Sequence, residues 1–67
     1  MNVKIYIRPF GDGFMVEAVE NDVLHKISKV ADYSKAIIKT AVLVMEYRAE
    51  GIQPQIFNEL RTHVQVN

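Results

Sequence analysis

The stretch RPFGDGF, from Arg8 to Phe14, gathers an arginine, an aspartate and two glycines, a composition that could bind a phosphate group. A phosphate loop presents consecutive backbone N–H groups to one point, usually where the chain enters a helix. Here the glycines lead into a strand-like segment, and neither the GxGxxG nor the GxxxxGK motif is present. We therefore interpret the stretch as a hairpin turn. Gly11 and Gly13 would supply its positive φ angles, or Gly13 would occupy a position that a β-carbon would crowd.

Ser34, His25 and Asp32 carry the functional groups of a catalytic triad. However, Asp32 precedes a helical pattern and is better explained as a helix cap or a turn residue. His25 lies beside Lys26 on a predicted strand, where a solvated or hydrogen-bonded histidine is the simpler interpretation. The three residues therefore do not predict a nucleophilic site.

Glu17 and Glu20 could form a carboxylate pair, but residues three apart on a strand face opposite ways. His63 has no neighbouring residues that would make it a metal ligand. Nothing in the chain assembles a nucleophile, a base and an oxyanion donor. The sequence thus predicts a protein that is not an enzyme, with no metal or other cofactor.

Four lysines (Lys26, Lys29, Lys35 and Lys39) are opposed within their segment only by Asp32. Lys35 would lie near a helix N-terminus, where phosphates are favoured. The whole chain is neutral, with eight basic and eight acidic residues, so its bulk charge does not demand nucleic acid. A solvated charged face is the favoured interpretation, and nucleic-acid binding through these lysines is the alternative function.

A chain of 67 residues forms one domain and buries only about 60 % of the surface that it exposes when unfolded. Its stability is therefore marginal without disulfides, a metal or a partner subunit. The sequence contains no cysteine, which excludes disulfides and thiolate zinc sites. Self-association is the remaining means of stabilisation. The apolar stretch from Ala41 to Met45 is too short to cross a bilayer, and no signal-peptide pattern precedes residue 3, so we expect a cytoplasmic protein without a membrane segment.

Three segments alternate between apolar and polar residues as strands do: Val3–Arg8, Phe14–Glu20 and Val23–Val30. The first two are joined by a glycine-containing loop, which predicts a hairpin. The third could also form a short helix, but its β-branched residues favour a strand.

A long helix is predicted from Tyr33 to Glu50, with Asp32 or Ser34 as its N-cap and Gly51 as its C-terminal cap. Pro54 would open a short turn that carries Ile56, Phe57 and Leu60, and residues 62–66 are consistent with a last short strand. The predicted fold class is α+β: a three-stranded antiparallel meander, one long helix packed on the sheet, and a short C-terminal turn or strand.

This order of elements resembles the small domain of HicB-like antitoxins. Asp12-Gly13-Phe14-Met15-Val16 is similar to that family's turn into an aromatic-led second strand, and Asp32-Tyr33-Ser34-Lys35-Ala36 to its capped helix entry. The resemblance covers residues 3–51 and implies a fold like that of double-stranded-RNA-binding domains. It also implies an antitoxin-like role. The family's Pro-Gly segment after the second strand is replaced here by Glu20-Asn21-Asp22, and no DNA-binding module follows.

The predicted helix is apolar around most of its circumference, with Lys35, Lys39, Glu46 and Glu50 confined to an arc of about 60°. A helix that only covers a sheet needs an apolar stripe of about 100°. We expect the core to contain Val3, Ile5, Ile7, Phe14, Val16, Ile37, Ala41 and Val44. The surplus apolar surface would be covered by Ile56, Phe57 and Leu60 of the same chain or, as we favour, by a second subunit.

The four charges are symmetric about a point between Val42 and Leu43, with lysines on one side and glutamates on the other. Antiparallel packing against a second copy would place Lys39 opposite Glu46 and Lys35 opposite Glu50, as an isologous interface requires. The expected dimer interface is Lys35, Lys39, Val42, Leu43, Glu46 and Glu50. The sequence thus predicts a homodimeric protein-binding module that binds or inhibits another protein, in the manner of a HicB-like antitoxin or a phage-type regulator.

Overall fold

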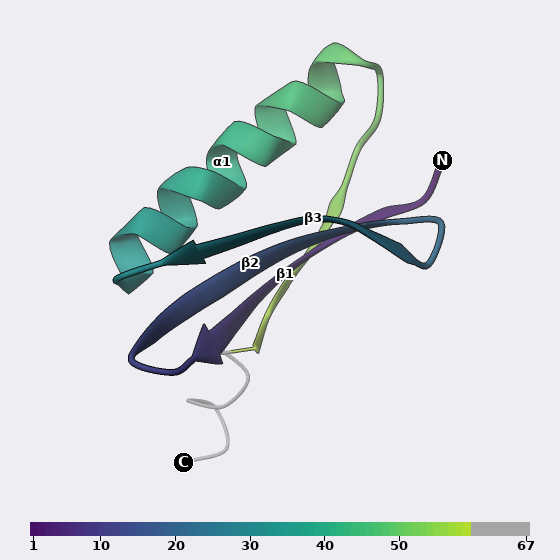
Figure 1. Cartoon of the computed structure of the whole chain (residues 1–67). Coiled ribbons are helices and arrows are strands. Elements are labelled where there is room, and N and C mark those ends of the chain that lie inside the picture. The colour runs from purple at the N-terminus through teal and green to yellow at the C-terminus, as the bar shows by residue number, and fades with distance from the viewer. Residues whose placement is uncertain (60–67) are drawn as a thin grey trace.

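The computed structural model describes residues 1–59, so Leu60, His63 and the strand expected at residues 62–66 lie outside the described part. The elements follow the order β1 (Val3–Phe10), β2 (Gly13–Glu20), β3 (Val23–Val30), α1 (Tyr33–Ala49) and β4 (Gln55–Asn58). The sheet has the strand order β3-β2-β1-β4, with β1, β2 and β3 antiparallel and β4 parallel to β1. Helix α1 lies across one face of this sheet (Figure 1). The predicted α+β fold, with its meander, single helix and short C-terminal strand, is confirmed.

The β1–β2 hairpin closes through a turn of Gly11 and Asp12, tighter than the loop expected from the sequence. Gly11 has a φ of 58°, as such turns require. Gly13 does not share that conformation and pairs with Phe10 as the first residue of β2. A β-carbon on Gly13 would overlap the carbonyl oxygen of Val30, where the end of β3 passes close by. Crowding, and not a positive φ, therefore requires glycine at this position.

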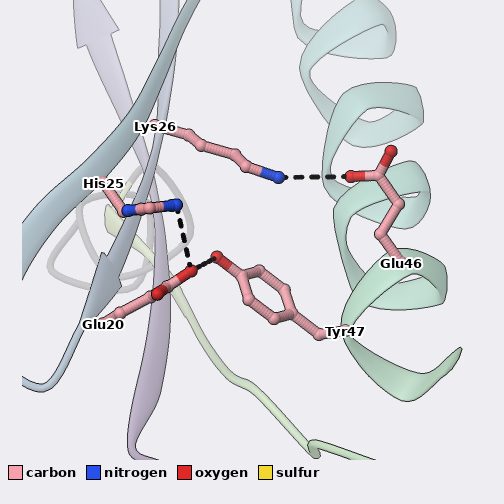
Figure 2. A network of polar contacts seen from close by, with 5 residues as sticks. All are labelled: Glu20, His25, Lys26, Glu46 and Tyr47. Carbon is pink, nitrogen blue, oxygen red and sulfur yellow. Dashed lines mark hydrogen bonds and ion pairs between the residues drawn. The ribbon is translucent and has the colours of Figure 1, made fainter. Parts of the chain in front are cut away.

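Strand β3 has the predicted bounds, but its register against β2 shifts between Ala18 and Val19. Ala18 pairs with Lys26 and Val19 pairs with Leu24, so His25 is the extra residue of a β-bulge. The bulge interrupts the simple alternation expected for this strand. It lets both His25 and Lys26 reach groups on the helix side of the sheet (Figure 2).

Helix α1 is capped as the sequence predicts. The Asp32 carboxylate accepts hydrogen bonds from the Lys35 backbone N–H (2.9 Å) and the Ser34 hydroxyl (2.8 Å). The pKa of Asp32 is lowered by these two hydrogen bonds, of which the one from the Lys35 backbone has the larger effect. At the other end Gly51 adopts a φ of 81° and donates to the Arg48 carbonyl (2.9 Å), so the helix ends where the sequence places its glycine cap.

The core combines one face of the sheet with one face of α1. Its buried apolar residues are Val3, Ile5, Ile7, Val16, Ala18, Ala36, Leu43 and Tyr47. Four of the predicted sheet residues lie in this core, and the predicted Phe14 and Val44 are partly buried and pack against it. The predicted helix face is wrong at its other two positions, because Ile37 is 42 % exposed and Ala41 is exposed. The helix instead buries Ala36, Thr40, Leu43 and Tyr47.

Two polar residues explain why the helix turns this face to the sheet. Thr40 donates its hydroxyl proton to the Ala36 carbonyl (2.9 Å), which satisfies the group inside the helix itself. Tyr47 carries its hydroxyl to Glu20 at the rim of the core. Both residues can therefore be buried without an unpaired polar atom.

The segment after Pro54 is a strand and not the predicted turn. β4 pairs with β1 in parallel, with Ile56 beside Ile5 and Phe57 beside Tyr6. The Phe57 and Tyr6 rings stack with centroids 5.1 Å apart on the face of the sheet opposite the helix. Ile56 remains 51 % exposed and Phe57 41 % exposed, so neither side chain completes the core.

Candidate functional site

A network of polar contacts joins the end of the β2–β3 hairpin to the C-terminal half of α1 (Figure 2). The Tyr47 hydroxyl donates to Glu20 Oε2 at 2.6 Å, and His25 Nε2 lies 3.6 Å from the same oxygen. Beside them, Lys26 Nζ lies 3.6 Å from Glu46 Oε1 and 5.6 Å from the centre of the Tyr47 ring. The network thus connects the helix to strands β2 and β3.

The contacts of this network hold α1 against the sheet. Burial and then the Glu20 carboxylate raise the pKa of Tyr47 to about 12, so its hydroxyl remains a neutral donor at physiological pH. Glu20 is engaged by two partners, and His25 is half exposed. The arrangement positions the helix and offers no group activated for attack on a substrate.

The structure does not assemble the triad-like residues. Ser34 donates to Asp32, and Asp32 also caps α1, whereas His25 contacts Glu20. No group of three or more His, Cys, Asp or Glu side chains suited to a metal ion occurs within residues 1–59. His63 lies outside the described residues.

The expectation that Glu17 and Glu20 face opposite ways is confirmed. Glu20 faces the helix, whereas Glu17 lies on the other face, where its Oε1 is 3.2 Å from Arg8 Nε. Glu59 Oε1 lies 3.3 Å from the same nitrogen, and the guanidinium covers the Tyr6 ring at 4.7 Å. Arg8 is thus neutralised by carboxylates of its own chain, which leaves little attraction for an external anion.

The four lysines singled out in the sequence do not form one patch. Lys26 reaches Glu46 on the helix side, whereas the Lys29 ammonium lies over the Phe10 ring (4.8 Å) on the opposite face of the sheet. Lys35 and Lys39 lie on α1. Nucleic-acid binding through these residues stays a prediction, and the sheet separates Lys29 from the other three lysines.

A groove of about 860 Å³ lies between α1 and β4. Its apolar walls come from both elements: Ile37, Ala41, Val44 and Met45 of α1, and Ile56 of β4. Ile7 and Thr40 also line it, and Arg48 and Glu59 are the charged residues among its lining. We call this feature the groove. An apolar hollow of this size is large enough to receive side chains of a partner.

The side of α1 that points away from the sheet carries a second apolar feature, the outer stripe of Ile38, Val42 and Met45. Their exposed fractions are 63 %, 41 % and 70 %. Met45 belongs to both features, so the outer stripe and the groove form one continuous apolar surface. This continuous exposed apolar surface makes the side of α1 away from the sheet a candidate interaction site.

The expected dimer interface is partly corrected. Leu43 is only 2 % exposed and packs in the core, so it cannot lie at a two-fold axis between helices. Glu46 pairs with Lys26 of its own chain. The pairing of Lys35 and Lys39 with Glu46 and Glu50 of a second copy stays a prediction. The groove was not predicted from the sequence, although the surplus apolar surface of the predicted helix indicated that part of the helix would lie outside the core.

Comparison with known proteins finds no match to a family profile, to a curated protein or to a solved structure. No helix within residues 1–59 is long and apolar enough to span a membrane.

Proposed function

We propose that this protein is a cytoplasmic protein-binding module that acts as a homodimer, with α1 as the main element of the subunit interface. The observation that carries the proposal is the continuous apolar surface formed by the outer stripe and the groove. Covering such surface yields about 25 cal/mol per Å², and within residues 1–59 nothing covers it. A second subunit is the usual stabiliser of a chain this short.

A further apolar surface supports binding of another protein. On the sheet face away from α1, Leu24, Ile27 and Phe57 are 51 %, 48 % and 41 % exposed. This surface remains open when the helix side is covered. An inhibitory role towards another protein, as the resemblance to HicB-like antitoxins implies, would use it.

The test is sedimentation velocity over a range of protein concentrations. We expect the wild type to form a dimer, and Ile38→Glu to shift it to monomer because a carboxylate would be buried in the interface. Val23→Glu is the matched control, since Val23 is 66 % exposed against 63 % for Ile38 and lies on β3, the opposite edge of the sheet from the groove. A wild type that stays monomeric at about 1 mM, corresponding to less than about 4 kcal/mol of binding, contradicts the proposal.

A further inference from the structure

One helix covers only part of the sheet. Neighbouring strands lie about 4.8 Å apart, so four strands side by side take up about 19 Å, whereas a helix is about 10 Å wide. α1 packs chiefly on β2, with lesser contacts to β3 and β1. Among the described residues this leaves a strip of about 9 Å, nearly the width of a second helix, on the side of the sheet with β1 and β4, and the groove lies there.

α1 is itself apolar on three of its four sides. One side packs on its own sheet, the next faces the groove with Ile37 and Val44, and the third is the outer stripe. The fourth side carries the charges, Lys35, Lys39, Glu46 and Glu50, and lies towards β3, as the ion pair between Lys26 and Glu46 shows. A helix apolar on three sides is typical of one packed on three sides. Its own sheet accounts for only one of them.

We propose that the outer stripe of α1 docks into the groove of a second copy, and that the second copy's outer stripe docks reciprocally into the first. The two helices then lie side by side as one layer between two sheets, related by a two-fold axis that runs along the helices. Each helix meets its own sheet, the partner's helix and the partner's sheet. This arrangement rests on the proposed homodimer and specifies its interface.

A second copy fits both exposed features at once. A helix from an unrelated protein could fill the groove, but it would leave the outer stripe in water. Reciprocal docking covers the groove and the outer stripe in both chains. It also keeps the charged side of each helix at the solvent-exposed margin of the layer, so Lys35, Lys39, Glu46 and Glu50 are not desolvated and do not pair across this interface. Arg48 and Glu59, which line the groove, are the charged residues that the docked helix meets.

The arrangement can be tested with single cysteines, because the natural sequence contains none. Val42→Cys places a thiol on the outer side of α1, and Ile56→Cys places one in the groove. Both wild-type side chains are substantially exposed, at 41 % and 51 %, so neither change disturbs the core. The two variants are mixed, allowed to exchange subunits, and treated with a short bifunctional thiol reagent. We expect cross-linked dimers that contain one chain of each variant, and at least tenfold less product from either variant alone.

The controls separate this inference from the homodimer itself. Asp12→Cys, in the exposed β1–β2 turn, should give no product above background with Val42→Cys. Efficient cross-linking of Val42→Cys with itself would indicate helices paired through their outer stripes and would overturn groove docking while leaving the dimer intact. A wild type that sediments as a dimer without any cross-link between Val42→Cys and Ile56→Cys would also overturn it. A monomeric wild type would overturn both proposals.

Discussion

Tyr47 belongs both to the hydrophobic core and to the polar network with Glu20, and it helps to set the orientation of α1. Its ring is buried against the sheet, being 3 % exposed, and its hydroxyl donates to Glu20. A hydrogen bond to a charged acceptor contributes roughly 1.5–3 kcal/mol. Because residue 47 lies on the same side of the helix as Leu43, this bond selects the face of α1 that meets the sheet.

The raised pKa of Tyr47 predicts how stability depends on pH. The pKa of this hydroxyl is about 12 in the folded chain and near 10.0 when exposed, so the folded state holds the proton more tightly. The resulting stabilisation is fully present below pH 10 and is lost as the pH rises from about 10 to 12. Urea unfolding should show a steeper loss of stability over this range for the wild type than for Tyr47→Phe. Equal slopes would contradict the contact with Glu20.

Gly13 offers a second prediction at the residue scale. Gly13→Val should lower the free energy of unfolding by roughly 1–3 kcal/mol, because the β-carbon meets the backbone of Val30. Gly11→Asn is the matched control: nothing lies within 4 Å of a β-carbon at Gly11, and asparagine tolerates a positive φ. Thermal unfolding of the two variants measures the difference. An unchanged melting temperature for Gly13→Val would refute the close approach.

Among the elements, the two edges of the sheet differ in how they are protected. β3 carries a bulge and the lysines Lys26 and Lys29, which discourage pairing with another chain. β4 has the sequence Gln-Ile-Phe-Asn, without lysine, proline or a bulge. Within residues 1–59 this strand pairs only with β1 and lies beside the groove. The side of the sheet with β4 is therefore the one suited to a partner.

The orientation of α1 can be tested by truncating two of its side chains. Leu43→Ala should cost roughly 2–5 kcal/mol, because Leu43 is 2 % exposed within the core cluster. Ile37→Ala, at 42 % exposed, should cost less than about 1 kcal/mol in the monomer. Chemical denaturation at a concentration low enough to keep the chains apart compares the two variants. The reverse ranking would mean that the helix faces the sheet through Ile37.

At the scale of the whole molecule, stability should depend on protein concentration. If the folded chain is stabilised by a second subunit, mass action raises the melting temperature as concentration increases. We expect the midpoint to rise by several degrees between about 10 µM and about 1 mM for the wild type. Ile56→Glu, which places a charge in the groove, should abolish this rise without lowering the midpoint in dilute solution, because Ile56 is half exposed in the single chain. A wild-type midpoint that is independent of concentration would argue against a dimer.

The local features of this protein were determined by the sequence itself. Alternating residues predict β1, β2 and β3, and the Asp32 and Gly51 caps mark the helix ends, because these signals depend only on neighbouring residues. The core residues Val3, Ile5, Ile7 and Val16 follow from the same alternation. Sequence reasoning also detected that α1 has more apolar surface than one sheet can cover.

Tertiary structure alone decided the rest. A helix that is apolar on three sides carries no local information about which side meets the sheet, so the choice depended on Tyr47 reaching Glu20, a contact between residues 27 positions apart. The segment after Pro54 became a strand because the edge of β1 was free to pair with it. The groove exists because β4 extends the sheet past β1, on the side away from the strand on which α1 chiefly packs, and no pattern within either segment encodes that gap.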